Sequence, residues 1–185
     1  GGNPIPIAPL NFALGGAPGG VWTADDRIVY SSSSTALGMY EVPAEGGAFR
    51  EVLKVDPATD SDLHQPSLLP DGKSILFVTD LKADGPRRIE VYANGKRKVV
   101  LEEAKGEYVR FPVYSPTGHI LYSRRLPPAG VWAVRFDPGR LETEGEPFLV
   151  AADVGLPSVA DDGTLLVRPA SGTSLRQLAW LDTEG

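Results

Sequence analysis

The chain has 185 residues and a hydrophobic content of 42%, which is enough for a single domain with a buried core. It has no cysteine and a net charge of −6, which excludes disulfides and thiolate metal sites and argues against a nucleic-acid partner, because phosphates require a basic surface. No run of 18 apolar residues is present and the chain does not open with a signal peptide, so we expect a soluble chain of unknown compartment with no membrane partner.

Four segments repeat one pattern, in which a turn containing aspartate or glycine is followed by an apolar strand. The segments are Val21–Tyr30, His64–Val78, Val113–Tyr122 and Ser158–Val167. The equivalent apolar residues after the turns, Ile28, Ile75, Ile120 and Leu165, lie 47, 45 and 45 residues apart. A period of this size built from short strands is typical of propeller blades. The sequence therefore predicts an all-β fold, a β-propeller of four-stranded antiparallel blades with four blades in the chain.

The whole chain is predicted to be one propeller unit, with blades at about 19–55, 63–103, 107–152 and 154–185, the last completed by residues 3–9. In the first two blades, strands are expected at Gly19–Trp22, Ile28–Ser33, Leu37–Pro43, Ala48–Val55, Gln65–Leu69, Ser74–Thr79, Arg88–Tyr92 and Lys98–Leu101. In the other two, they are expected at Val109–Tyr114, His119–Arg124, Val131–Phe136, Pro147–Ala151, Leu156–Ala160, Thr164–Arg168 and Leu175–Leu181. Strands such as Ser74–Val78 are apolar on both faces, as expected between neighbouring blades.

The turns between these strands have a structural explanation. In Pro70-Asp71-Gly72 the proline fixes φ, the aspartate side chain bonds to the backbone, and the glycine takes the left-handed conformation. Asn94-Gly95 has the residues of a type I′ hairpin turn. Calcium binding by the aspartate pairs at 25–26 and 161–162 is not expected, because the pairs lie on different blades and the ion needs several converging oxygens.

The two ends of the chain resemble the hairpin of blade one. That hairpin turns at Glu45-Gly46-Gly47, and Glu184-Gly185 joined to Gly1 gives the same three residues. Pro4–Pro9 is therefore predicted to be the outer strand of blade four, where prolines are tolerated because only one strand edge forms hydrogen bonds. The residues expected to close the ring are Pro4, Ile5, Pro6, Ile7, Trp180 and Leu181.

The closing strand can come from the same chain or from a second chain. The first case gives a closed four-bladed monomer, and the second gives a homodimer that forms one eight-bladed ring with cyclic symmetry. Tyr108, Phe111 and Tyr114 are bulky residues at the entrance to blade three, whereas a four-bladed ring needs small residues at its axis. We therefore favour the homodimer, with the closed monomer and a fragment of a longer chain as alternatives.

The sequence offers no catalytic constellation. His64 and His119 are the only histidines, and neither a Gly-x-Ser-x-Gly nucleophile elbow nor a His-x-x-x-His zinc spacing is present. Glu102 and Glu103 are adjacent in an outer strand or loop, where neighbouring side chains point to opposite faces. We therefore expect no enzyme activity, no catalytic residue, no metal site and no cofactor.

A binding site is expected over the central channel, on the loops that join one blade to the next. The candidate rim consists of the connections 56–64 and 104–110, with Asp62, His64, Tyr108 and Arg110 as the candidate ligand or partner residues. The basic pairs Arg87–Arg88 and Arg124–Arg125 are expected to be solvated strand ends. The three tryptophans, Trp22, Trp132 and Trp180, are expected in the core between blades.

Three longer motifs carry a resemblance to known proteins: His64–Gly72, Tyr114–Tyr122 and Ala133–Pro147. They resemble the repeats of TolB-type, WD-repeat-like β-propellers, and most closely the propeller sensor segments of acidobacterial serine/threonine kinase-like proteins. The resemblance implies a propeller of six to eight blades that serves as a platform for varied partners. It favours a binding module that recognises a protein, a peptide or a small ligand. The alternatives are a half-propeller whose role is homo-assembly and a sensor fragment of a longer kinase-like chain.

Overall fold

A computed structural model describes residues 7, 19–31, 38–83, 85–104 and 106–169. Within them the chain forms strands β1 (Gly20–Trp22), β2 (Arg27–Ser31), β3 (Met39–Pro43), β4 (Arg50–Leu53), β5 (Asp60–Leu68), β6 (Ile75–Leu81), β7 (Arg88–Ala93), β8 (Lys96–Glu102), β9 (Arg110–Ser115), β10 (His119–Arg124), β11 (Gly130–Asp137), β12 (Glu142–Ala152), β13 (Val154–Val159) and β14 (Leu165–Pro169). No helix long and apolar enough to cross a membrane occurs in this part of the chain.

The strands form successive antiparallel sheets, and this confirms the predicted propeller fold. Strands β1 to β4, β5 to β8 and β9 to β12 each form one four-stranded sheet in chain order, and β13 pairs with β14. These sheets are blades one to four. The predicted strand at Leu175–Leu181 and the closing residues Pro4, Ile5, Pro6, Trp180 and Leu181 lie outside the described residues. Ile7 is described, and its carbonyl oxygen is 3.4 Å from the place of a Cβ on Gly46, beside the β3–β4 turn.

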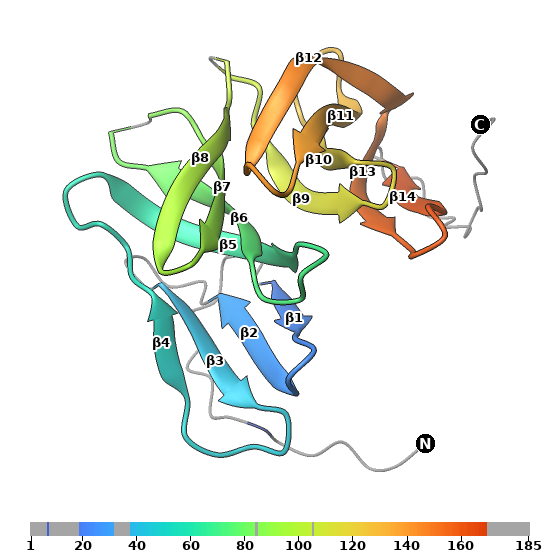
Figure 1. The fold of residues 1–185 in the computed structure, drawn as a ribbon. Coiled ribbons are helices and arrows are strands. Elements are labelled where there is room, and N and C mark those ends of the chain that lie inside the picture. The colour runs from blue at the N-terminus through green and yellow to red at the C-terminus, as the bar shows by residue number, and fades with distance from the viewer. Residues whose placement is uncertain (1–6, 8–18, 32–37, 84, 105, 170–185) are drawn as a thin grey trace.

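Figure 1 shows the sheets following one another around an arc, with the first strand of each blade on the inside and β4, β8 and β12 on the outside. Each inner strand contacts the preceding blade: β5 packs on β1 and β2, β9 on β5 and β6, and β13 on β9. The inner strands therefore run beside one another along the channel side of the arc.

Apolar side chains fill the spaces between the blades. Blades one and two enclose Val29, Met39, Leu53, Leu63, Ile75 and Phe77. Blades two and three enclose a larger cluster that includes Leu76, Ile89, Val91, Val109, Ile120, Tyr122 and Phe136. Neighbouring residues of β6 thus enter different clusters, which confirms that this strand is apolar on both faces because a blade covers each face.

The turn chemistry is also confirmed. The Asp71 Oδ1 atom accepts hydrogen bonds from the backbone N–H groups of Lys73 (3.0 Å) and Ser74 (2.8 Å), and its Oδ2 accepts one from the Ser74 hydroxyl (2.6 Å). Gly72 has φ +66°. Asn94 and Gly95 have φ values of 52° and 76°, and positive φ at both positions is what a type I′ turn requires.

A left-handed residue recurs at the same place in three inner strands. Gln65, Phe111 and Leu156 have φ values of 57°, 53° and 53°, each precedes a proline, and each lies where the pairing register shifts. Such conformations cost about 1–3 kcal/mol each and persist only where neighbouring structure holds them. Here the Phe111 N–H donates to Oε1 of Gln65 (2.8 Å), and the Ser67 hydroxyl donates to the Pro112 carbonyl (2.7 Å). The bulges therefore link blade two to blade three.

Strand β5 begins at Asp60, earlier than the predicted start at Gln65. Its first residues pair with the end of β6, where Asp60 is opposite Leu81. The Asp60 carboxylate is buried and accepts a hydrogen bond from Nη1 of Arg97 at 2.5 Å. This ion pair holds the segment in the sheet, so much of the predicted rim connection 56–64 is strand.

The predicted burial of the tryptophans is wrong for Trp22, whose side chain lies 63% exposed. Val21 packs against the core between blades one and two, and alternation along the strand turns Trp22 to the other face. Its indole N–H donates to Oδ1 of Asp26 at 3.1 Å. Trp132 is half-buried, and Trp180 lies outside the described residues.

The Asp71 turn provides a test of this account. Asp71→Ala removes three hydrogen bonds and should lower the free energy of unfolding by about 1–2 kcal/mol. Asp71→Asn keeps the Oδ1 acceptor and should lose less than half of that amount. Urea denaturation measures both variants, and equal losses would contradict the assignment of the effect to these hydrogen bonds.

Candidate functional site

A cavity of about 380 Å³ lies between blade two and the connection to blade three, where the β6–β7 and β8–β9 connections meet. It is lined by Ser61, Asp80, Leu81, Gly85, Arg87, Glu103, Gly106 and Tyr108. These residues come from the start of β5, the end of β6 and the two connections. The cavity therefore lies on the side of the blade-to-blade loops, where the sequence predicts a rim.

A histidine, an aspartate and an arginine meet beside this cavity. His64 on β5 is 7% exposed, and its Nε2 atom lies 3.2 Å from Oδ1 of Asp80 on β6. Nε of Arg87 donates to the same Oδ1 atom at 2.6 Å, and its Nη2 reaches Oδ2 at 3.4 Å. Burial alone would raise the pKa of Asp80, but the hydrogen bonds from His64 and Arg87 outweigh it and lower the pKa to about 2. Asp80 is therefore a fixed negative charge that orients the other two side chains.

Asp62 lies next to this group but is in a different state. Its Cα is opposite that of Asp80 in the β5–β6 pairing. Burial raises the pKa of Asp62 to about 6; the positive charge of His64 opposes this rise, and the Asp80 charge adds to it. The Asp62 Oδ1 atom and the Arg87 Nη1 atom are buried and have no hydrogen-bond partner among the described residues. The site thus holds one unpaired acceptor and one unpaired donor.

Tyr108 and Arg110 continue the site towards blade three. The guanidinium of Arg87 lies over the Tyr108 ring, 4.6 Å from its centroid, an arrangement that favours the cation. Tyr108 is 42% exposed and has φ 54°, so its ring is held at the surface by an unusual backbone conformation. Arg110 opens β9 and is half-buried, and it forms no ion pair within the described residues. It lies near enough to Arg87 and Asp80 for both charges to act on it.

The four residues nominated from sequence, Asp62, His64, Tyr108 and Arg110, therefore lie in one region, whereas their role in binding stays a prediction. Sequence reasoning missed Asp80 and placed Arg87 in solvent. Arg87 is only 14% exposed because its guanidinium lies between Asp80 and Tyr108. The expectation of solvated strand ends is also wrong for Arg124, which is 16% exposed, pairs with Glu107 and lies 4.0 Å from the Trp132 ring centroid.

Other buried charges of blade two serve its structure. Arg97 on β8 donates from Nε to Oε2 of Glu90 (2.9 Å), from Nη1 to Asp60 (2.5 Å) and from Nη2 to the Thr79 hydroxyl (3.2 Å). Burial lowers the pKa of Arg97, but the bonds to Glu90 and Asp60 outweigh it and raise the pKa. The four residues come from the four strands of the blade, so this network ties its strands together.

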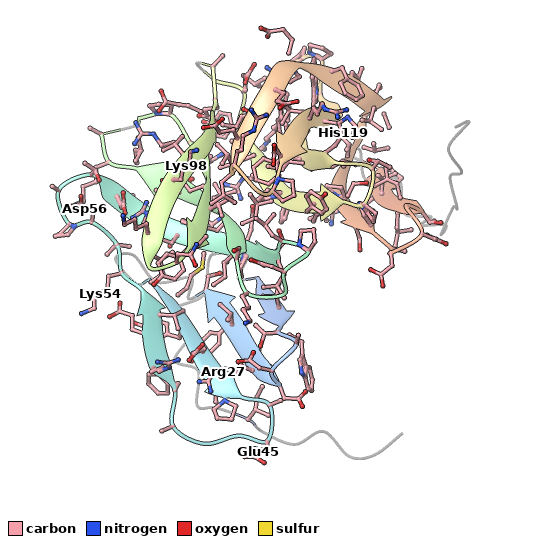
Figure 2. All side chains as sticks on the ribbon, viewed as in Figure 1. Arg27, Glu45, Lys54, Asp56, Lys98 and His119 are labelled. Atoms are coloured by element: carbon pink, nitrogen blue, oxygen red, sulfur yellow. The ribbon has the colours of Figure 1, made fainter. Side chains whose placement is uncertain are left out.

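Whereas His64 lies on β5 of blade two, His119, labelled in Figure 2, lies on β10 of blade three. Its Nδ1 is 3.1 Å from the Thr117 hydroxyl, and its ring packs edge-on against Phe148 at 5.7 Å. Lys98, also marked in Figure 2, donates to the Arg140 carbonyl and to Glu142, both at 3.0 Å, and so joins the outer strands of blades two and three. Among the residues that the structure describes, no group of three histidine, aspartate or glutamate side chains is arranged to hold a metal ion.

Comparison with solved structures gives propellers and propeller-like enzymes. An oligogalacturonate lyase in complex with manganese matches with a TM-score of 0.56 and 13% identity, over 83% of this chain and 45% of that one. A GH43 endo-arabinanase from Bacillus licheniformis matches with 0.54 and 12%, over 88% and 69%. The β-propeller domain of the trilobed protease from Pyrococcus furiosus, which has an open velcro topology, matches with 0.51 and 16%, over 84% and 49%.

No family model matches the sequence, and no curated protein does. The structural likenesses are all below 25% identity and show the fold, a β-propeller. The chain spans less than half the length of the lyase that it matches. The enzymatic names belong to those proteins, and the expectation that this chain is not an enzyme stays a prediction.

The raised pKa of Asp62 makes stability depend on pH in a defined direction. A carboxyl with a pKa of about 6 in the folded protein and about 4 when unfolded binds more protons in the folded state, so stability falls as the pH rises between these values. Asp62→Asn removes this loss and should be more stable than the wild type at pH 7.5 by about 1 kcal/mol, since solvent screens part of the effect.

Urea denaturation at pH 4 and pH 7.5 measures the difference. The control is Asp153→Asn, which removes the same charge at an exposed position. A wild-type stability that does not fall between the two pH values would contradict the assignment to Asp62.

Proposed function

We propose that the chain is a non-catalytic propeller module that binds a protein, a peptide or a small ligand over the central channel. The observation that carries the proposal is the meeting of Asp62, His64, Tyr108 and Arg110 around Asp80 and Arg87, beside a cavity of about 380 Å³. Concave sites with a few convergent polar groups are where proteins bind ligands.

The details of the rim support this role. An unsatisfied buried donor or acceptor costs about 1–3 kcal/mol, and a ligand that bonds to Asp62 Oδ1 or Arg87 Nη1 recovers part of that cost. The exposed Tyr108 ring adds an aromatic surface of the kind enriched in binding interfaces. Strained backbone at Gln65, Tyr108 and Phe111 surrounds the site, and such strain clusters at ligand-binding positions.

The resemblance of the repeats to the sensor segments of kinase-like proteins supports the same role. We propose that the chain belongs with TolB-type, WD-repeat-like propellers and that the rim is its recognition surface. The main alternative is a half-propeller whose only role is to assemble. The exposed Trp22 on blade one supports that alternative, because a blade of a second copy could pack on this side chain.

We further propose that the four blades are half of a ring. The chain spans 45% and 49% of the lengths of the matching lyase and protease propeller chains, as half a ring would, and 69% of the matching arabinanase. Two copies, with Pro4–Pro9 of one chain completing blade four of the other, would give eight blades. In the alternative, this chain is a piece of a longer protein, and the rest of that protein supplies the missing blades.

Binding at the rim can be tested without knowing the ligand. A fragment library screened by two-dimensional amide NMR should shift signals at residues 61–64, 80–87 and 106–111. Arg110→Ala should weaken the best fragments about tenfold, the loss of about one charged hydrogen bond, and should change the free energy of unfolding by less than about 1 kcal/mol. Arg88→Ala, which removes only the exposed pair with Glu102, should leave binding unchanged. Fragments that gather instead on β8 or β12 would contradict the proposal.

Assembly is tested by light scattering with size-exclusion chromatography. The expected mass is twice the 19.7 kDa of one chain, and it should fall to one chain on dilution if the interface is reversible. A mass of one chain at all concentrations, with a folded circular-dichroism spectrum, would defeat the dimer.

A further inference from the structure

A second cavity, of about 160 Å³, lies between blade three and the β13–β14 hairpin. Its lining consists of Tyr108, Arg110, Phe111, Ser123, Arg124, Arg125, Val154, Gly155, Leu156, Arg168 and Pro169. Four of these residues are arginines and none is an acid. In a chain with a net charge of −6, such a concentration of positive charge is a local feature that the overall composition does not explain.

One of the four arginines is already compensated. Arg124 pairs with Glu107 and stacks on Trp132. Arg110, Arg125 and Arg168 form no ion pair within the described part of the chain, although thirteen such pairs occur there, several of them with exposed arginines. Arg110 begins β9, Arg125 directly follows β10, and Arg168 lies on β14.

Arg110, Arg125 and Arg168 differ in their exposure to solvent. Arg110 is half-buried, whereas Arg125 and Arg168 are exposed. Burial lowers the pKa of Arg110, the positive charges of Arg87 and Arg125 lower it further, and Asp80 acts in the opposite direction. Positive charge at the base of the cavity is therefore under-compensated, because Asp80 and Glu107 pair with other arginines, Arg87 and Arg124.

We propose that this cavity binds a single oxyanion, a carboxylate or a phosphate group of a small ligand, held by Arg110, Arg125 and Arg168. The guanidinium fork matches both groups in a bidentate manner, and partial burial strengthens the interaction. A volume of about 160 Å³ suits one anionic group. Phe111, Val154 and Leu156 add an apolar wall against which the rest of the ligand can pack.

The inference rests on the proposed binding role, to which it adds a ligand class. Tyr108 lines both cavities, so a ligand at the blade two–three rim can place its anionic group between blades three and four. The bulge at Leu156 fixes the second cavity, because the Leu156 N–H donates to the Ser123 hydroxyl at 3.0 Å across the two blades. The arginine positions are therefore set by the same blade packing that forms the rim.

The test uses inorganic phosphate and acetate as separate probes, titrated at constant ionic strength and followed through the arginine Nε–H signals in NMR. At least one probe should shift the signals of Arg110, Arg125 and Arg168 saturably, and the probe that binds more tightly identifies the group. Arg125→Gln and Arg168→Gln should each weaken binding about tenfold, and Arg168→Lys should lie between wild type and glutamine. The control Arg135→Gln removes an exposed arginine of the same blade, paired with Glu144, and should bind as the wild type does.

Stability without the probe separates binding from a structural role. Because the three cations repel one another, both glutamine variants should be at least as stable as the wild type in urea, whereas structural arginines would lose stability when replaced. The absence of saturation with both probes, or equal binding by the glutamine variants, would overturn the anion site. If the anion site fails in this way but fragments still map to residues 61–64 and 80–87, the proposed rim is supported. If anions bind saturably but no fragment maps to those residues, the rim is overturned and the anion site is not.

Discussion

Each blade of this chain is apolar on both faces, and neither face is buried unless another blade packs against it. The alternation along β6 makes the constraint concrete: Phe77 enters the core shared with blade one, and Leu76 enters the core shared with blade three. Burial at roughly 25 cal/mol per Å² of apolar surface is therefore obtained at the interfaces between sheets, since a single twisted sheet has no interior. This packing places the inner strands side by side and so determines where every functional side chain lies.

The same packing explains why polar groups gather where the connections between blades two, three and four lie. His64 follows the buried Leu63 on β5 and lies against Asp80, and Arg110 follows the buried Val109 and lies within reach of the charges of Asp80 and Arg87. Between blades two and three, Asp80 pairs with both His64 and Arg87. Between blades three and four, Glu107 pairs with Arg124, and Arg110, Arg125 and Arg168 form no ion pair within the described residues. The two cavities thus have different electrostatic character although the repeat builds them in the same way.

The features that follow local rules could be predicted from the sequence. The period of the repeat predicted the positions of the blades. Asp71 and Asn94 predicted turns that the structure contains, because turn chemistry depends on a few adjacent residues. Partners distant in sequence could not be predicted: nothing near Arg87 indicates that it binds Asp80 and covers Tyr108. The left-handed conformations of Gln65, Phe111 and Leu156 were missed too, because each stands before a proline, which favours an extended conformation in the residue that precedes it.

The position of the two cavities separates ligand binding from ring closure. The first is lined by residues of blade two and of the connection to blade three, and the second by residues of blade three, of that connection and of β13–β14. Both lie at interfaces inside one chain rather than at the free side of blade one, where Trp22 is exposed. One chain therefore contains every residue named for either cavity. The residues that line both cavities are placed by the packing of blades two, three and four, so the two proposals, ligand binding and ring closure, concern different parts of the molecule.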